Sequence, residues 1–172
     1  MKPLPDVVGP DLRVLFCGIN PSLLSAERGH HFARPGNRFW PALHLGGFTQ
    51  RVLTPDEDRT LPALGLGITN VVDRPTRAAA ELSDAELHEG FAALSALVAR
   101  LRPGVLAMVG MGAWRTVSGD RSAGVGLQTG PGVGGRPVWV LPNPSGLNAS
   151  YQLPALGRLF ADLREFSGTP PT

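Results

Sequence analysis

The stretch Val105-Leu106-Ala107-Met108-Val109 is apolar at every position and is followed by Gly110. A strand with one face in water alternates apolar and polar residues, so an unbroken apolar run indicates a strand that is covered on both faces. Three other segments are mostly apolar in the same way and complete the expected core strands: Arg13–Gly18, Gly67–Val72 and Val138–Leu141. Strands of this kind are typical of parallel sheets with helices packed on either side.

Helical patterns lie between these strands. Ser83-Asp84-Ala85-Glu86 is a capping box, and the apolar residues after it, from Leu87 to Leu101, recur at helical spacing. Further helices are expected over Asn37–Leu45, from Thr54 onward, over Ala113–Val117 and over Leu153–Phe166. An edge strand is expected over Val125–Thr129 and a long loop over Ile19–Gly36. The alternation predicts an α/β fold, a three-layer α/β/α architecture with a central, mostly parallel sheet. We expect a single domain over residues 1–172, with its core over about residues 11–167.

The composition is that of a compact globular protein. Of the 172 residues, 42% are hydrophobic and 17% are charged, which argues against disorder. No apolar run is long enough to span a membrane, and Met1-Lys2-Pro3 does not begin a signal peptide. We therefore expect a cytoplasmic protein without a membrane partner, and we expect it to be a monomer.

The basic residues are almost all arginine, since Lys2 is the only lysine among the 16 Lys and Arg residues. The guanidinium group suits bidentate phosphate contacts, but a high-GC coding bias would produce the same excess of arginine. The formal net charge of +2 is compatible with a polyanionic partner and does not require one.

No metal ion and no cofactor are expected. Cys17 is the only cysteine and lies in an apolar run, which favours a buried, inert thiol over a nucleophile. A single cysteine also excludes an internal disulfide and a cysteine-rich zinc site. The four histidines do not have the spacing of metal ligands.

Ligands of parallel α/β sheets bind beyond the carboxyl ends of the strands. Four segments are expected to meet there: Gly18–Pro21, Asp73–Pro75, Gly110–Gly112 and Asn143–Asn148. Around the last of them, Pro142 and Pro144 exclude helix and continued strand, and Gly146 permits a turn that a residue with a Cβ atom would resist. Leu147 follows at the expected loop tip, where a leucine buries nothing within the fold, so we expect another molecule to receive it.

Two of these segments carry a family resemblance. Gly18-Ile19-Asn20-Pro21 and Leu141-Pro142-Asn143-Pro144-Ser145-Gly146-Leu147 resemble the two signature motifs of the mismatch-specific uracil-DNA glycosylase / thymine-DNA glycosylase family, in the same order. Further blocks also resemble family sequence: Phe32-Ala33 with Asn37–Trp40, Gly47–Thr49, Val72–Thr76 and Leu87–Gly90. The resemblance runs from about Arg13 to the closing helix, and it implies a uracil-DNA glycosylase-like fold.

The resemblance implies an enzyme that removes uracil and related mispaired pyrimidines from double-stranded DNA. Such an enzyme flips the nucleotide into a pocket and hydrolyses the N-glycosidic bond, which begins base-excision repair. Asn20 would position the attacking water, because an amide can orient a water but cannot take its proton. Leu147, between Gly146 and Asn148, would fill the hole left in the stack, and Phe32 would stack on the extruded base.

Other candidate residues surround these. Ile19, Ser25 and Asn143 are expected around the base, and Asn143 stands where more active uracil glycosylases carry a histidine, so turnover should be modest. Candidates for phosphate contacts are Ser22, Ser145, Ser150, Arg28, Arg34 and Arg38, each weighed against an ordinary surface side chain. His30-His31 is expected to be an exposed pair, with a phosphate contact as the alternative.

Asp73 is the one carboxylate expected at the carboxyl end of a core strand. We hypothesise that it activates the water or stabilises the oxocarbenium-like sugar. An ion pair with Arg74 or Arg77, or a loop cap, is the alternative. Two positions depart from the family pattern: Asn70 replaces a lysine that the family can carry, and Ala149 replaces an arginine often found two residues beyond the wedge leucine. The second departure predicts relaxed selectivity for the opposing base.

Two other function classes fit less well. A nucleotide-binding protein that used Gly110-Met111-Gly112 would need a third glycine where Arg115 stands. A lesion binder without catalysis is disfavoured because Asn20 and Asn143 are both present.

The scarcity of lysine predicts a monofunctional glycosylase. Cleavage of the strand by a glycosylase proceeds through a Schiff base, which needs an amine, and Lys2 offers the only side-chain amine near an expected loose terminus. Incubation of the protein with a uracil-containing duplex and borohydride is expected to yield no covalent protein–DNA adduct. Strand cleavage together with a trapped adduct would contradict this prediction.

Overall fold

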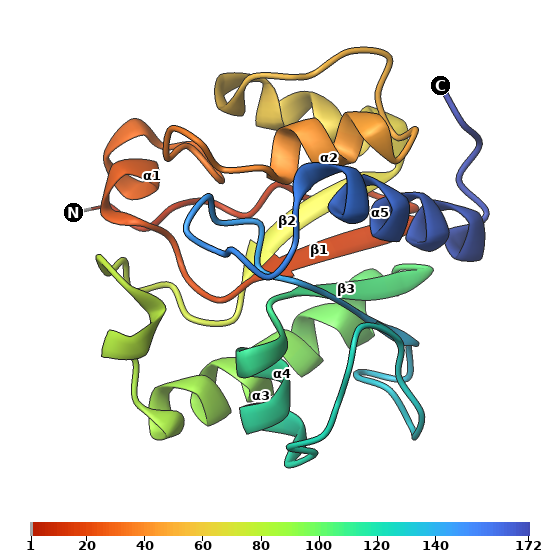
Figure 1. The fold of residues 1–172 in the computed structure, drawn as a ribbon. Coiled ribbons are helices and arrows are strands. Elements are labelled where there is room, and N and C mark those ends of the chain that lie inside the picture. The colour runs from red at the N-terminus through yellow and green to blue at the C-terminus, as the bar shows by residue number, and fades with distance from the viewer. Residues whose placement is uncertain (1) are drawn as a thin grey trace.

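The computed structural model describes residues 2–172, and a five-stranded sheet lies at its centre with the order β2-β1-β3-β5-β4 (Figure 1). The strands are β1 (Val14–Gly18), β2 (Leu66–Asn70), β3 (Val105–Val109), β4 (Gly126–Leu127) and β5 (Val138–Leu141). The four longer strands are parallel to their neighbours, and β4 is antiparallel to β5. The prediction of a mostly parallel sheet from unbroken apolar runs is therefore confirmed.

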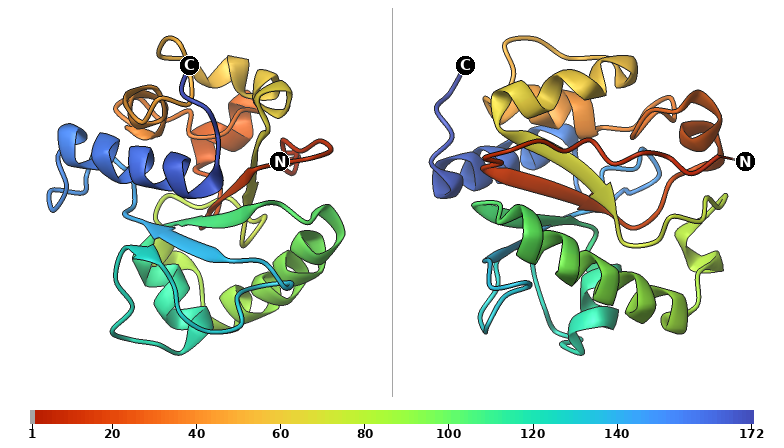
Figure 2. Two further views of the ribbon diagram at one scale, coloured as in Figure 1. Left: turned by 90° about the vertical axis from the view of Figure 1, so that its right-hand side faces the viewer. Right: turned by 180° about the vertical axis from the view of Figure 1, so that it is seen from behind.

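Helices cover both faces of the sheet, which makes the three layers (Figures 1 and 2). One face carries α2 (Phe39–Leu45), α5 (Leu153–Ser167) and the 3₁₀ helix η1 (Pro55–Leu64), and the other carries α3 (Asp84–Leu101) and α4 (Met111–Ser118). Two shorter helices, α1 (Leu23–Arg28) and η2 (Ala79–Glu81), lie outside these layers. No helix within residues 2–172 is long and apolar enough to cross a lipid bilayer.

The two faces of the sheet are packed differently. On the α2/α5 side Phe16 is in edge contact with Phe39 and Phe48 and stacks on Phe160, with ring centroids 5.2, 5.8 and 5.9 Å away. The α3/α4 side is filled mainly by aliphatic residues such as Leu94, Val98 and Leu106. Aromatic contacts of this kind add to the free energy of burial, so the α2/α5 side is the more tightly specified of the two.

Cys17 lies on the α3/α4 side of β1, the strand between β2 and β3, and its side chain is fully buried. Burial raises the pKa of its thiol, and the negative charge of Asp6 raises that pKa further. A thiol that stays protonated is a poor nucleophile, as its apolar neighbours in the sequence suggested.

Several elements differ from the sequence-based expectations. The strand β2 begins at Leu66 and ends at Asn70, two residues before Val72, because Val71 and Val72 turn to bond the carbonyls of Gly18 and Ile19 at 2.9 and 3.0 Å. The edge strand is only Gly126–Leu127. The helix that begins after Thr54 is a 3₁₀ helix, and Pro62 lies inside it.

The segment Ile19–Gly36, which was expected to be a loop, contains α1. Its start is capped by Ser22, whose hydroxyl accepts from the Ser25 N–H at 3.0 Å. Its end is Gly29, in the left-handed conformation with φ 74°. Serine and glycine at these places are ordinary helix boundaries, but a helix of six residues shows too little apolar periodicity to be predicted.

The N-terminal segment before β1 runs across the sheet edge and is held there by Val7, whose N–H and carbonyl pair with Ile68 at 2.9 and 2.8 Å. This isolated antiparallel bridge lies on the outer side of β2, the strand at one edge of the sheet. It covers part of that edge and carries Leu4 and Pro5 toward the carboxyl ends of the strands.

Replacement of glycine by alanine is expected to have opposite effects on the free energy of unfolding at two helical positions. A Cβ atom at Gly90 in α3 would lie 2.1 Å from the Val71 carbonyl oxygen, whereas a Cβ atom at Gly112 in α4 would have no neighbour within 4 Å. Gly90→Ala is expected to lower the free energy of unfolding by about 1–3 kcal/mol through overpacking. Gly112→Ala is expected to raise it by up to about 1 kcal/mol through helix propensity. Urea denaturation measures both, and a stabilised Gly90→Ala variant would contradict the packing.

Candidate active site

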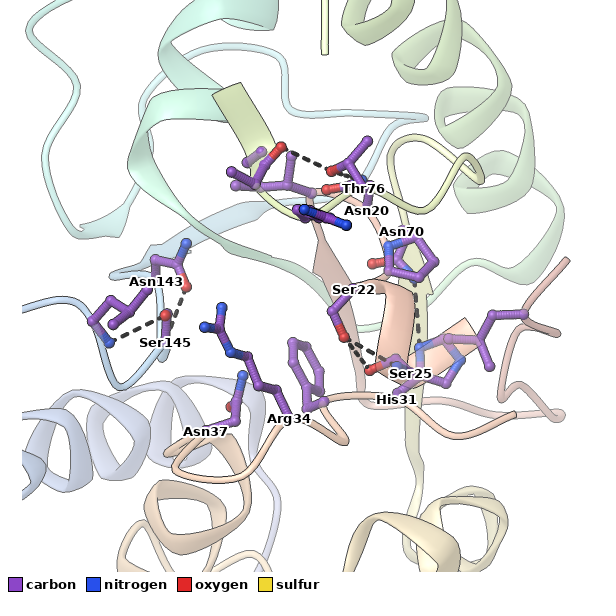
Figure 3. Close-up of a pocket in the computed structure, with 18 residues that line it drawn as sticks. Asn20, Ser22, Ser25, His31, Arg34, Asn37, Asn70, Thr76, Asn143 and Ser145 are labelled. Atoms are coloured by element: carbon purple, nitrogen blue, oxygen red, sulfur yellow. Dashed lines mark hydrogen bonds between the residues drawn. The ribbon is translucent and has the colours of Figure 1, made fainter. Parts of the chain in front are cut away.

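A cavity of about 260 Å³ opens at the carboxyl ends of β1, β2 and β5 (Figure 3). It is smaller than the pockets that usually hold drug-sized ligands, which suits a single small ring. Predicted site residues that line it are Ile19, Asn20, Ser22, Ser25, Phe32, Asn143, Ser145 and Leu147. The structure therefore brings residues from the first and last core strands, including Asn20 and Leu147, to one cavity.

Asn20 has an amide whose orientation is determined by its neighbours. Its Nδ2 donates to the carbonyl of Arg74 and to Oγ1 of Thr76, both at 2.8 Å. The carbonyl can only accept, and the Thr76 hydroxyl already donates its hydrogen to the Ala78 carbonyl at 2.8 Å. Both neighbours therefore need a donor, so the amide NH₂ faces them, and Oδ1 is left without a protein donor among residues 2–172.

Asn143 presents the opposite end of its amide. Its Oδ1 accepts from the Ser145 N–H at 2.9 Å, which closes a tight turn after β5. The NH₂ group has no protein acceptor among the described hydrogen bonds and is exposed at the cavity. Figure 3 shows Asn143 on the opposite side of the cavity from Asn20 and Asn70. The site thus offers a free amide acceptor and, across the cavity, a free amide donor.

Phe32 supplies an aromatic wall. Its ring stacks on Phe39 with centroids 4.1 Å apart and planes 22° apart, and its backbone has φ 51°, a conformation that is uncommon for a bulky residue. The next residue, Ala33, is held by a hydrogen bond from its N–H to the buried hydroxyl oxygen of Ser25 at 3.0 Å. Backbone strain held by such contacts is typical of functional sites.

His31 and Asn70 form the far wall of the cavity. The ring Nε2 of His31 lies 2.7 Å from the Pro5 carbonyl, which can only accept, so Nε2 carries the hydrogen and Nδ1 is an acceptor. Nδ2 of Asn70 is 3.5 Å from that Nδ1, a long hydrogen bond. Burial lowers the pKa of His31, so the neutral ring is the stable form.

The expectation that His30 and His31 are an exposed pair was wrong. His31 is 2% exposed, and its N–H donates to Oδ2 of the buried Asp58 at 2.9 Å. His30 is partly buried, with its Nδ1 3.1 Å from Oδ1 of the same carboxylate. Asp58 comes from η1, so this distant helix holds the turn that precedes Phe32.

Two candidate phosphate contacts also have structural partners. Arg38 was expected on the surface, but its guanidinium group donates to three carbonyls of the loop after β5 and is not free for a phosphate. Ser22 lines the cavity and at the same time caps α1. Arg34 is exposed and lines the cavity, and Figure 3 shows its side chain between Asn143 and Ser25.

Leu147 is 78% exposed at the edge of the cavity. Gly146 before it lies in the predicted turn, in which the Asn148 N–H donates to the Ser145 carbonyl at 3.0 Å, but its φ is not positive. A Cβ atom at Gly146 would lie 2.8 Å from the Gly36 carbonyl oxygen, and close approach is therefore the reason for glycine there. Asn148 closes the loop, because its Nδ2 donates to the Asn143 carbonyl at 3.0 Å.

Asp73 is exposed and does not line the cavity. Because β2 ends at Asn70, the residue at the rim of this strand is Asn70 and not Asp73. Arg74, one of the partners considered for Asp73, pairs instead with Glu86 at 2.7 Å. Burial raises the pKa of Asp6, the hydrogen bond from Thr69 lowers it, and the negative charge of Asp73 raises it.

Thr76 and Asp58 were missed as site residues, His31 was considered only for a phosphate contact, and Asn70 was noted only as a departure from the family pattern. If the end of β2 had been predicted at Asn70, this residue would have been recognised as lying at the carboxyl end of a core strand, where the site was expected. The other three carry no local signal. Within residues 2–172 no three His, Cys, Asp or Glu side chains are placed to hold a metal ion.

Comparisons with known proteins agree with the fold. The family model described as the uracil DNA glycosylase superfamily matches residues 5–164. A solution NMR structure of a "putative Uracil DNA glycosylase" from Methanosarcina acetivorans superposes with a TM-score of 0.66 at 20% identity. The match covers 96% of this chain and 97% of that one, so the two chains share one fold over nearly their full lengths.

The buried His31 predicts a pH dependence of stability. Its folded pKa lies below the ordinary value of 6.5, so the unfolded chain binds a proton more readily. The free energy of unfolding should therefore fall as pH falls from 7 toward 5, by at most about 1.4 kcal/mol per pH unit for one proton. His31→Gln is expected to flatten this slope, and the exposed His88→Gln is expected to retain it. Equal slopes for wild type and His31→Gln in chemical denaturation would contradict the assignment.

Proposed function

The chain belongs to the uracil DNA glycosylase superfamily, and on that premise we propose that it is a monofunctional, mismatch-specific glycosylase for uracil and related pyrimidines in double-stranded DNA. The observation that carries the proposal is the meeting of Asn20, Phe32, Asn143 and Leu147 at one small cavity. These residues supply a water-orienting acceptor, a stacking surface, a donor for the departing base and an apolar wedge.

The cavity is proposed to bind a flipped pyrimidine. Phe32 stacks on the ring, an interaction of about 1–3 kcal/mol for a base on an aromatic side chain. The amide of Asn70, bonded to His31 on one side, faces the polar edge of the base on the other. An amide offers both a donor and an acceptor, which matches the N3–H and O4 groups of uracil.

Hydrolysis is proposed to begin with a water that donates a hydrogen bond to Oδ1 of Asn20. The N-glycosidic bond breaks, its electron pair leaves with the base, and the water oxygen forms the new bond to C1′. The NH₂ of Asn143 donates to the base as negative charge develops on it. The proton of the water passes to the departing base or to solvent, because an amide cannot hold it.

Asp73 is retained in the proposal as a source of negative charge. Its carboxylate is outside the cavity lining, so it would act through its field on the positive, oxocarbenium-like sugar and not by taking a proton directly. Asp73→Asn with full excision would remove Asp73 from the mechanism.

Leu147 is proposed to occupy the space that the flipped nucleotide leaves in the stack. Flipping costs a few kcal/mol, and an inserted apolar side chain offsets part of that cost. Leu147 is 78% exposed without DNA, so insertion also removes apolar surface from water. With Ala149 in place of an arginine, contacts to the opposing base are few, and we propose relaxed selectivity for that base.

Excision assays with variants of Asn20 and Thr76 test this proposal. Wild type should release uracil from a U:G duplex, and Asn20→Ala should lower the rate at least about 100-fold, the range of a lost water-positioning group. Thr76→Val keeps the shape of the side chain and removes the acceptor for Asn20, so we expect a loss of about 10-fold.

The matched control is Thr60→Val, because Thr60 is exposed on η1 and bonds only the Glu57 carbonyl. This variant should excise uracil at the wild-type rate. A wild-type protein that releases no base from any pyrimidine mismatch would refute the proposed function, and an active Asn20→Ala variant would refute the role of Asn20.

A further inference from the structure

We propose that Arg38 is a positioning residue that holds the loop of residues 143–151, here called the wedge loop, so that Leu147 is ready to enter the DNA stack. This inference rests on the proposed function. Arg38 precedes α2 and touches neither the expected site of the base nor the expected site of the attacking water.

The contacts of Arg38 span the whole wedge loop. Its Nη2 donates to the carbonyls of Ser145 at 2.7 Å and Asn148 at 2.9 Å, and its Nη1 donates to the carbonyl of Tyr151. Its backbone N–H donates to the Pro144 carbonyl at 2.9 Å. One residue therefore binds four carbonyl groups on both sides of Leu147.

The wedge loop has no other hydrogen bond to the rest of the described chain. Its remaining bonds are internal: Ser145 N–H to Asn143, Leu147 N–H to Ser145, Asn148 to Ser145 and Asn143, and Ser150 N–H to Asn148. Such turns shape a loop but do not fix it to the body of the protein. Arg38 supplies that attachment through hydrogen bonds, together with the close packing of Gly146 on Gly36 and the packing of Tyr151 against the core.

Arginine is suited to this role. The planar guanidinium group directs its donors in fixed directions, so it can reach several carbonyls at once, whereas an ammonium group is a point donor. Arg38 forms no ion pair among residues 2–172, so its charge is balanced by carbonyl dipoles and not by a carboxylate. A neighbouring carboxylate would compete for the guanidinium and release the loop.

The position of Arg38 also connects the wedge loop to the base pocket. Asn37 before it lines the cavity, and Phe39 after it stacks on Phe32. A loop held in its working conformation before binding loses less conformational entropy on the DNA. Arg38 should therefore matter for the step in which the nucleotide is flipped, and not for the cleavage of a base that is already free of the stack.

A double-mutant cycle tests this inference. The variants are Arg38→Met, Leu147→Ala and the two combined, with kcat/KM measured on uracil in a duplex opposite guanine and opposite adenine. Arg38→Met and Leu147→Ala should each lower kcat/KM about 10-fold or more, and the combined variant should be no slower than Leu147→Ala alone, as expected for residues that act as one unit. On a single-stranded oligonucleotide, Arg38→Met should retain wild-type activity.

The controls separate a positioning role from general damage. Arg38→Lys keeps the charge, but its single nitrogen cannot take the places of both Nη1 and Nη2 of Arg38. It should therefore be nearly as slow as Arg38→Met on duplex DNA and should serve as the test variant if Arg38→Met does not fold. Arg158→Met, an exposed arginine of α5, should behave as wild type. Thermal unfolding of each variant confirms that the chain is folded.

The outcomes are distinct. Losses that add in the combined variant, full activity of Arg38→Met, or full rescue by Arg38→Lys would each overturn the role of Arg38. Absence of uracil release by the wild-type protein would instead overturn the proposed function. An equal loss on single-stranded and duplex substrates would show that Arg38 acts on the pocket and not on the wedge loop.

Discussion

The parallel pairing of β1 with its two neighbours is the constraint on which the site depends. Val14 lies opposite both Leu66 and Val105, and the three strands then run in the same direction and in register. Their carboxyl ends therefore reach one edge of the sheet, and β5 joins that edge through its pairing with β3. The polypeptide that leaves each strand must turn there, and these turns carry the polar groups of the cavity.

Four asparagine amides line the site, those of Asn20, Asn37, Asn70 and Asn143, and hydrogen bonds determine which end of the Asn20 and Asn143 amides faces the cavity. Backbone carbonyls and a threonine hydroxyl turn the amino group of Asn20 away, and a backbone N–H turns the oxygen of Asn143 away. A neutral amide has no charge to attract water or counter-ions, so its function depends on direction alone. The hydrogen bonds around Asn20 and Asn143 therefore serve to orient the two amides, which do not exchange protons.

The sequence predicted the structural features that depend on residues close together in the chain. Unbroken apolar runs located the four parallel strands. Because ligands of such sheets bind beyond the carboxyl ends of the strands, Asn20, Asn143 and Leu147 were expected together at one edge. The parts that were missed depend on partners far apart in the chain: His31 with Pro5, Asn20 with Thr76 and Arg38 with Asn148, at separations of 26, 56 and 110 residues. No local pattern marks such a partner. Arg38 was therefore considered only as a phosphate contact or a surface side chain, and His31 was expected to be exposed.

Because Cys17 is buried, its reaction with a thiol reagent can report how often the core of the protein opens. It is the sole cysteine of the protein, and it is fully buried in β1, between β2 and β3, on the face that α3 and α4 cover. A thiol reagent can reach it only after this layer of helices opens, so the rate of labelling follows the opening of the core and not the fraying of its margins. One modification per molecule, counted by mass spectrometry, would thus record how often the scaffold beneath the cavity comes apart, with or without DNA.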